Sequence, residues 1–223
     1  MKRLLGSFTL AVWLGSLLSL VALPVQPASA SFVSGCSVSQ YTDYNVRRLD
    51  AQAYADVARH EGYEWGGGCW NSNNKDDTPG QPDSNGEGPD CSGLVYKTWE
   101  LRDKANDIGF TYYDRMQNIH GKFISNDFHS PETSDPFVAI SKSNMMYMDA
   151  FAKNGHVAML WTGPGATAGT DYVLEAYSDA DGVIVASRSY RTDASYTGAK
   201  REGWTPDCWP HCQDAPPETV RVP

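Results

Sequence analysis

Three short runs of β-branched and other apolar residues follow one another in the second half of the chain, at residues 157–161, 172–176 and 182–186. Glycine, threonine, aspartate and serine residues separate the runs, so they predict strands that pair antiparallel in sequence order. Apolar residues at helical spacing predict two helices ahead of them, at 49–58 and 91–101. Helices followed by such strands predict an α+β fold, with the helices packed on one side of an antiparallel sheet.

Residues 1–30 have the order of parts that directs a protein to export. Two basic residues precede an apolar run at 4–25, and Ala28, Ser29 and Ala30 supply the small residues of a signal-peptidase site. We expect cleavage after Ala30; an uncleaved membrane anchor is the alternative, because the run is nearly long enough to span a bilayer. No second apolar stretch in the sequence has that length, so we expect a secreted or cell-envelope protein that is free of the membrane after signal cleavage.

Cleavage makes the chain more acidic. The full sequence has a formal net charge of −9, and the loss of Lys2 and Arg3, with no acidic residue in 1–30, changes it to −11. A surface with this charge repels polyanions on average. It therefore argues against nucleic acid and anionic lipid as partners, and we expect a monomer that acts on a small or roughly neutral substrate strand.

Most of the mature chain belongs to one predicted domain. The sequence is 41% hydrophobic, which is enough for one substantial core. We place a catalytic domain at residues 45–190, after a polar lead at 31–44 and before a Cys- and Pro-rich extension at 191–223, and we expect the tail from Trp204 to lack a core of its own. The stretch at 70–89 is almost wholly polar and rich in turn-forming residues, which predicts a long solvated loop.

Five cysteines in an exported chain leave one unpaired when the others form disulfides. We expect Cys36, Cys69, Cys208 and Cys212 to form two bridges, in any of three pairings, and Cys91 to stay free. Two alternatives concern the paired cysteines. The sequence that ends at Cys36 resembles the lipobox of bacterial lipoproteins, which would make it a lipid attachment site. The segment from Cys208 to Cys212 contains metal-like ligands that could bind zinc.

Cys91 has the position of a nucleophile, in the first turn of a predicted helix that Asp90 can cap. The free backbone N–H groups of a helix N-terminus lower the pKa of a thiol there. His156 begins the first strand and is a suitable base for a Cys–His pair in acyl transfer. Glu175 lies in the next strand among apolar residues, so we expect it to orient the imidazole; an outward-facing carboxylate is the alternative. Three other histidines lack such a pattern, and we interpret them as surface or structural residues: His60, His120 and His129.

Three short motifs occur in a fixed order along the chain. Residues 63–67 read Tyr-Glu-Trp-Gly-Gly, residues 90–95 read Asp-Cys-Ser-Gly-Leu-Val, and residues 155–160 begin Gly-His-Val. Together they closely resemble the NlpC/P60 family of papain-like cysteine peptidases, over roughly residues 45–190. The resemblance implies a papain-like NlpC/P60 fold, in which an antiparallel sheet packs against helices and the nucleophile lies at a helix N-terminus.

The resemblance also implies a function, which is the hydrolysis of amide bonds in the stem peptides of bacterial peptidoglycan. The partner would be peptidoglycan or its muropeptides, and the reaction would pass through a thioester that needs no metal or organic cofactor. Tyr63 would lie beside the thiolate and help to stabilise the oxyanion or to place the substrate. Asp90 and Ser92 would contact the amine and backbone of the substrate, and the backbone N–H of Cys91 is a further oxyanion donor.

Two alternative functions stay open at this point. The same catalytic triad would serve an N-acetylmuramoyl-L-alanine amidase or an enzyme that cleaves the bridges between stem peptides. A catalytically silent, secreted binding or toxin-like module would keep the fold without turnover. The presence of both Cys91 and His156 favours an enzyme over the silent module.

Overall fold

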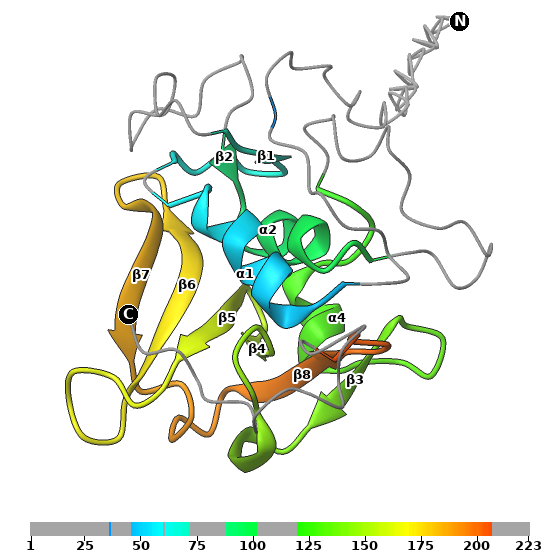
Figure 1. Cartoon of the computed structure of the whole chain (residues 1–223), viewed down its shortest axis with the longest axis vertical. Helices are drawn as coiled ribbons and strands as arrows, with labels where there is room; N and C mark the ends of the chain where they lie inside the picture. Colours follow the sequence, from blue (N-terminus) through cyan, green and yellow to red (C-terminus); the bar gives the residue numbers. More distant parts are fainter. Residues whose placement is uncertain (1–35, 37–45, 60, 72–87, 102–119, 207–223) are drawn as a thin grey trace, which may run out of the picture.

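A six-stranded antiparallel sheet forms the body of the protein (Figure 1). The computed structural model describes residue 36 and residues 46–59, 61–71, 88–101 and 120–206. The strands lie in the order β3-β8-β4-β5-β6-β7. Their bounds are β3 Phe137–Ile140, β4 Ala150–Lys153, β5 His156–Thr162, β6 Asp171–Ser178, β7 Gly182–Arg188 and β8 Thr197–Arg201. With three α-helices beside this sheet in the described part of the chain, the α+β class predicted from the sequence is confirmed.

The predicted elements correspond to observed ones with small shifts at their ends. The three predicted strands are β5, β6 and β7, and each is longer than predicted. The two predicted helices are α1 (Arg48–Asp56) and α2 (Cys91–Thr98), and both end earlier than predicted. Glu100 explains the end of α2, because its φ of 44° is left-handed and cannot continue a right-handed helix.

The helices cover one face of the sheet, where the larger hydrophobic core lies. Helix α2 packs on β5 and against α1, and α4 (Ser125–His129) packs on β4. Figure 1 shows α1 and α2 in front of the sheet. Side chains of β5 alternate between the two faces. Val157 and Met159 enter the helix-covered core, whereas Ala158 and Leu160 enter a smaller cluster that includes Tyr196 on the opposite face.

Strand β8 extends the folded body beyond the predicted domain boundary at residue 190. It lies between β3 and β4, and its Ala199 is fully buried in the main core. The segment 191–201 is therefore part of the sheet domain, and the predicted boundary at residue 190 lies too early in the chain. The sequence of β8, Thr-Gly-Ala-Lys-Arg, has no alternation of apolar residues that would predict a strand.

One disulfide lies within the described residues, between Cys36 and Cys69 of β1 (Gly68–Cys69), which pairs with β2 (Gly88–Pro89). A sulfur in a disulfide is not available for lipid attachment, and the Cys91 thiol is free. Of the helices that the structure describes, none has the length and apolar character needed to cross a membrane. Several predictions concern segments outside the described residues: the signal sequence 1–30, most of the lead 31–44, most of the loop 70–89, and Cys208 and Cys212.

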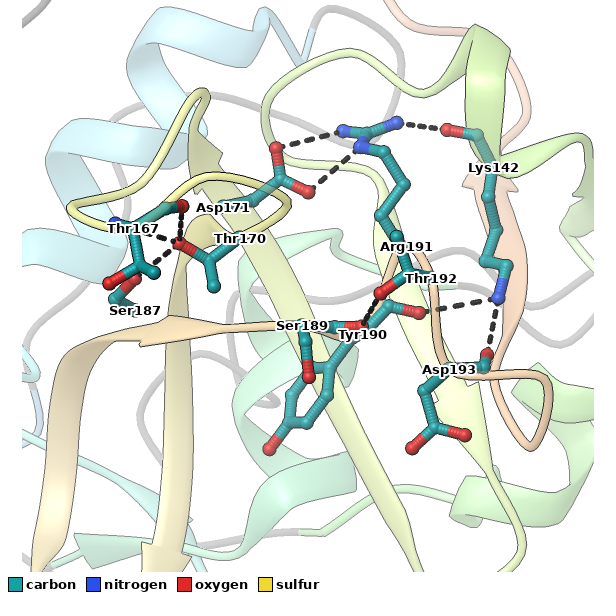
Figure 2. A network of polar contacts seen from close by, with 10 residues as sticks. All are labelled: Lys142, Thr167, Thr170, Asp171, Ser187, Ser189, Tyr190, Arg191, Thr192 and Asp193. Carbon is teal, nitrogen blue, oxygen red and sulfur yellow. Dashed lines mark hydrogen bonds and ion pairs between the residues drawn. The ribbon is translucent and has the colours of Figure 1, made fainter.

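A polar network fixes the segment that follows β7 (Figure 2). Arg191 donates from Nε to Asp171 Oδ2 at 2.8 Å, and its guanidinium also donates to the backbone oxygen of Lys142. Lys142 belongs to the short 3-10 helix η1 (Lys142–Asn144), and its Nζ donates to the backbone oxygens of Tyr190, at 3.3 Å, and Asp193. The network therefore anchors the segment that carries Tyr190 to β6 and η1.

Candidate active site

His156 and Glu175 form a buried hydrogen-bonded pair on neighbouring strands. Lys153 of β4 pairs with His156 of β5, so His156 directly follows a two-residue turn in which Gly155 has a φ of 86°. The His156 Nε2 lies 2.7 Å from Oε2 of Glu175, whose side chain is fully buried. Because a carboxylate only accepts, Nε2 carries the hydrogen, and Glu175 is not the outward-facing carboxylate of the alternative interpretation.

Two further side chains hold Glu175, and sequence reasoning missed both. Arg188 Nε donates to Oε1 at 2.6 Å, and the Tyr190 hydroxyl donates to Oε2 at 2.9 Å. Burial alone would raise the pKa of the Glu175 carboxyl, but the hydrogen bonds and charges of His156 and Arg188 lower it overall. The carboxylate is therefore ionised at neutral pH and can stabilise an imidazolium on His156.

A cavity of about 550 Å³ opens beside His156. The rings of Tyr177 and Tyr190 stand edge-on to the imidazole, each at 6.1 Å between centroids. A cavity of this volume is large enough for a short peptide segment. The other lining residues are Lys153, Asn154, Gly155, Ser178, Arg188, Asp193 and Tyr196.

Cys91 is the first residue of α2 and is 9% exposed. Its thiol lies at the backbone N–H of Val157, which directly follows His156, and also contacts Ser92. The packing of α2 on β5 thus brings the thiol to the start of the strand that carries the imidazole. Among the hydrogen bonds of these described residues, none joins the Cys91 thiol directly to the His156 ring.

The thiol of Cys91 is protonated at neutral pH. Burial raises its pKa to about 11, and the Asp90 carboxylate adds to the rise. The contacts with Val157 and Ser92 act in the opposite direction without offsetting burial. The prediction of a lowered pKa is wrong for the resting protein. The free-energy penalty for ionising a thiol away from water exceeds the stabilisation of the thiolate by the free N–H groups of the helix. For this thiol to act as a nucleophile, a base would first have to remove its proton.

Tyr63 lies half-buried within electrostatic range of the nucleophile. Burial raises the pKa of its phenol far above the usual range, and the charges of Cys91 and Asp90 raise it further. The phenol therefore keeps its proton at neutral pH and remains a hydrogen-bond donor close to the thiol.

Asp90 caps α2 and ties the helix to the preceding glycine turn. Its Oδ1 accepts from the backbone N–H of Gly93 at 2.7 Å, and its Oδ2 accepts from that of Gly66 at 3.0 Å. A Cβ on Gly93 would lie 2.0 Å from the oxygen of Gly67, so only glycine allows this approach. The two glycine-containing motifs therefore meet in space and fix the first turn of α2, where Cys91 lies.

His120 belongs to the same cluster, although its sequence context predicts only a surface or structural role. Its Nε2 lies 2.6 Å from Ser92 Oγ and 3.2 Å from Asp90 Oδ2. No motif links His120 to these residues, because only the tertiary structure brings them together. His129 has a structural role, with its Nδ1 at 3.1 Å from the Ala152 oxygen, and His60 lies outside the described residues.

Neither a metal site among the described residues nor a match to a known protein adds to this geometry. Within the described ranges, no group of three or more His, Cys, Asp or Glu side chains is arranged to hold a metal ion. No protein-family model, curated protein or solved structure matches the chain. The resemblance to the NlpC/P60 family thus stays a prediction that rests on the three motifs.

Proposed function

We propose that the protein is a secreted cysteine hydrolase with a papain-like fold of the NlpC/P60 type, which cleaves amide bonds in peptidoglycan stem peptides. The observation that carries the proposal is the buried pair of His156 and Glu175, at the strand whose next backbone N–H contacts the free thiol of Cys91. An ionised carboxylate, an imidazole and a thiol in this order are the parts of a nucleophile, base and orienting group.

Activation of the thiol falls to the nitrogen of His156 that faces away from Glu175. Because Nε2 donates to the carboxylate, Nδ1 is the atom that accepts the thiol proton. The thiolate then attacks the substrate carbonyl, and the imidazolium returns its proton to the leaving amine. Water attacks the resulting thioester with His156 again as base, which releases the acid product and restores the thiol.

Stabilisation of the developing charges comes from groups already in place. The Glu175 carboxylate, held by Arg188 and Tyr190, stabilises the imidazolium. The backbone N–H of Cys91 and the Tyr63 phenol are the donors for the oxyanion, since one is a free first-turn amide and the other keeps its proton.

Two surface features support a peptide-like substrate. The cavity beside His156 combines tyrosine rings with polar side chains, which suits a segment with both apolar and polar groups. Trp65 is 84% exposed on the turn that carries Gly66, the residue bonded to Asp90, so a large ring is available near the nucleophile. The choice of peptidoglycan as substrate rests on the motif resemblance.

Digestion of defined muropeptides, followed by mass spectrometry, tests the proposal. We expect new fragments from a cut within the stem peptide, and no fragments from Cys91→Ala at equal concentration. A cut between the lactyl group and the first residue would instead identify an amidase, and a cut in the bridge would identify a cross-bridge enzyme. Absence of any cleavage by the wild-type protein, or full activity of Cys91→Ala, would overturn the mechanism.

A further inference from the structure

The Asp90 carboxylate, directly before the nucleophile, is fully engaged by groups of the protein itself. Oδ1 accepts from Gly93 N at 2.7 Å and from Ser92 Oγ at 3.2 Å. Oδ2 accepts from Gly66 N at 3.0 Å and lies 3.2 Å from His120 Nε2. A carboxylate has about four acceptor directions. These four partners use them all, so no acceptor is left for a donor of the substrate.

The contacts of His120 identify its protonation state. Nδ1 lies 2.9 Å from the oxygen of Gly121, which only accepts, so Nδ1 carries a hydrogen. Nε2 faces two oxygens, the acceptor-only Oδ2 of Asp90 at 3.2 Å and Ser92 Oγ at 2.6 Å, and a hydrogen on Nε2 satisfies both. Only an imidazolium has a hydrogen on both nitrogens. Burial opposes this charge, but the hydrogen bond and charge of Asp90 raise the pKa of His120 overall.

The charges next to the nucleophile therefore cancel. The His120 imidazolium neutralises the Asp90 carboxylate at close range. Among the described residues, two further titratable groups near this cluster, the Cys91 thiol and the Tyr63 phenol, are uncharged at neutral pH, because burial raises the pKa of both. The Asp179 carboxylate also acts on Tyr63 and raises the pKa of its phenol further. An isolated carboxylate at this place would bind a substrate ammonium. Beside a neutral cluster whose acceptors are all occupied, the ammonium would lose its hydration and gain no partner in return.

We infer that His120 is a specificity-determining residue that makes the protein act on peptides whose amino terminus is already acylated, in preference to peptides with a free α-ammonium. The inference rests on the proposed hydrolase function and deepens it, since it selects stem peptides still joined to another group. It also replaces the role that the resemblance implies for Asp90 and Ser92, which was contact with a substrate amine. Here those two residues bind His120 instead.

Two stem peptides that are identical except for a free or an acetylated amino terminus test the inference. For the wild-type protein we expect kcat/KM to be at least about tenfold higher for the acetylated peptide than for the free peptide. A factor of about ten corresponds to the free energy of one charge-assisted hydrogen bond. His120→Gln keeps a neutral donor and removes the charge, and it should lower this ratio about tenfold by improving the free peptide. His120→Lys keeps the charge and should keep the preference, which separates the effect of charge from that of packing.

Binding to Cys91→Ala, measured by calorimetry with the same two peptides, gives a readout that does not depend on turnover or on folding of the His120 variants. A tighter complex with the acetylated peptide supports the inference even if neither peptide is cleaved. The absence of cleavage would count against the proposed function and not against the inference. A wild-type preference for the free peptide, in turnover or in binding, overturns the inference. So does an unchanged ratio in a folded His120→Gln protein, as judged by its thermal unfolding.

Discussion

Replacement of Glu175 by glutamine tests the orienting role of this residue most directly, because the two side chains have nearly the same shape. In the wild-type protein Glu175 accepts three hydrogen bonds, from Arg188 Nε at 2.6 Å, His156 Nε2 at 2.7 Å and the Tyr190 hydroxyl at 2.9 Å. Arg188 can only donate, so the amide oxygen of glutamine must face it. The amide NH₂ then faces His156, and it can form a hydrogen bond there only if Nε2 becomes the acceptor.

This reversal moves the imidazole hydrogen to Nδ1, the nitrogen that must accept the thiol proton. A base held in the wrong tautomer lowers kcat by roughly 10⁴-fold in a serine hydrolase whose triad also pairs an imidazole with a buried carboxylate. Loss of the carboxylate charge also removes the stabilisation of the imidazolium, which is part of the same effect. We therefore expect Glu175→Gln to lose about 10³-fold or more in kcat, with little change in KM.

The assay is steady-state hydrolysis of a muropeptide, together with nitrogen NMR of the His156 ring to read its tautomer. Asp149→Asn is the matched control, because it changes another buried carboxylate that pairs with an arginine, Arg48, outside the contacts that hold Glu175. We expect the control to lose stability and to keep kcat within about threefold of the wild type. A Glu175→Gln protein with nearly full kcat, or with Nε2 still protonated, would refute the reasoning.

Three further predictions follow from the site. Alkylation of Cys91 by iodoacetamide should accelerate as pH rises toward about 11, since burial keeps the thiol protonated below that value; a rate that levels off near pH 7 would show an ionised resting thiol. Gly93→Ala should lower the free energy of unfolding by about 1–3 kcal/mol in urea titrations, because its Cβ would lie 2.0 Å from the oxygen of Gly67, and unchanged stability would contradict this contact. Tyr190→Phe should reduce kcat about fivefold, the effect of one hydrogen bond to Glu175, and an unaltered kcat would show that Arg188 alone fixes the carboxylate.

The parts of the fold that the sequence predicts are those with a local pattern. The strands β5, β6 and β7 have apolar runs bounded by turn residues, and α2 has a cap at Asp90 and apolar residues on one side. Strands β3 and β8 escape prediction because they are short and interrupted: two of the four residues of β3 are exposed, and three of the five residues of β8 are polar. Their pairing joins distant segments, and nothing local indicates it.

The residues of the candidate site also differ in whether a local sequence pattern predicts them. Cys91, His156 and Glu175 are accessible to prediction because each stands in a short motif or an unusual position on a strand. His120 and Arg188 are not, because their partners are chosen by tertiary contacts that no local spacing encodes. The prediction of a lowered thiol pKa is wrong for a related reason. The helix N-terminus, which lowers the pKa, is visible in the sequence, whereas the burial that raises it more strongly is a property of the whole fold.

The position of β8 has a consequence for how the sheet is completed during synthesis. Strand β3 borders only β8 in the sheet, so it has no neighbour until the chain has been made as far as residue 201. A chain that stops shortly before residue 201 lacks a complete β8. Strand β3 then has no partner, and the edge of β4 that normally pairs with β8 is exposed to other chains. Late synthesis of this strand thus delays closure of the sheet until residue 201 has emerged from the ribosome.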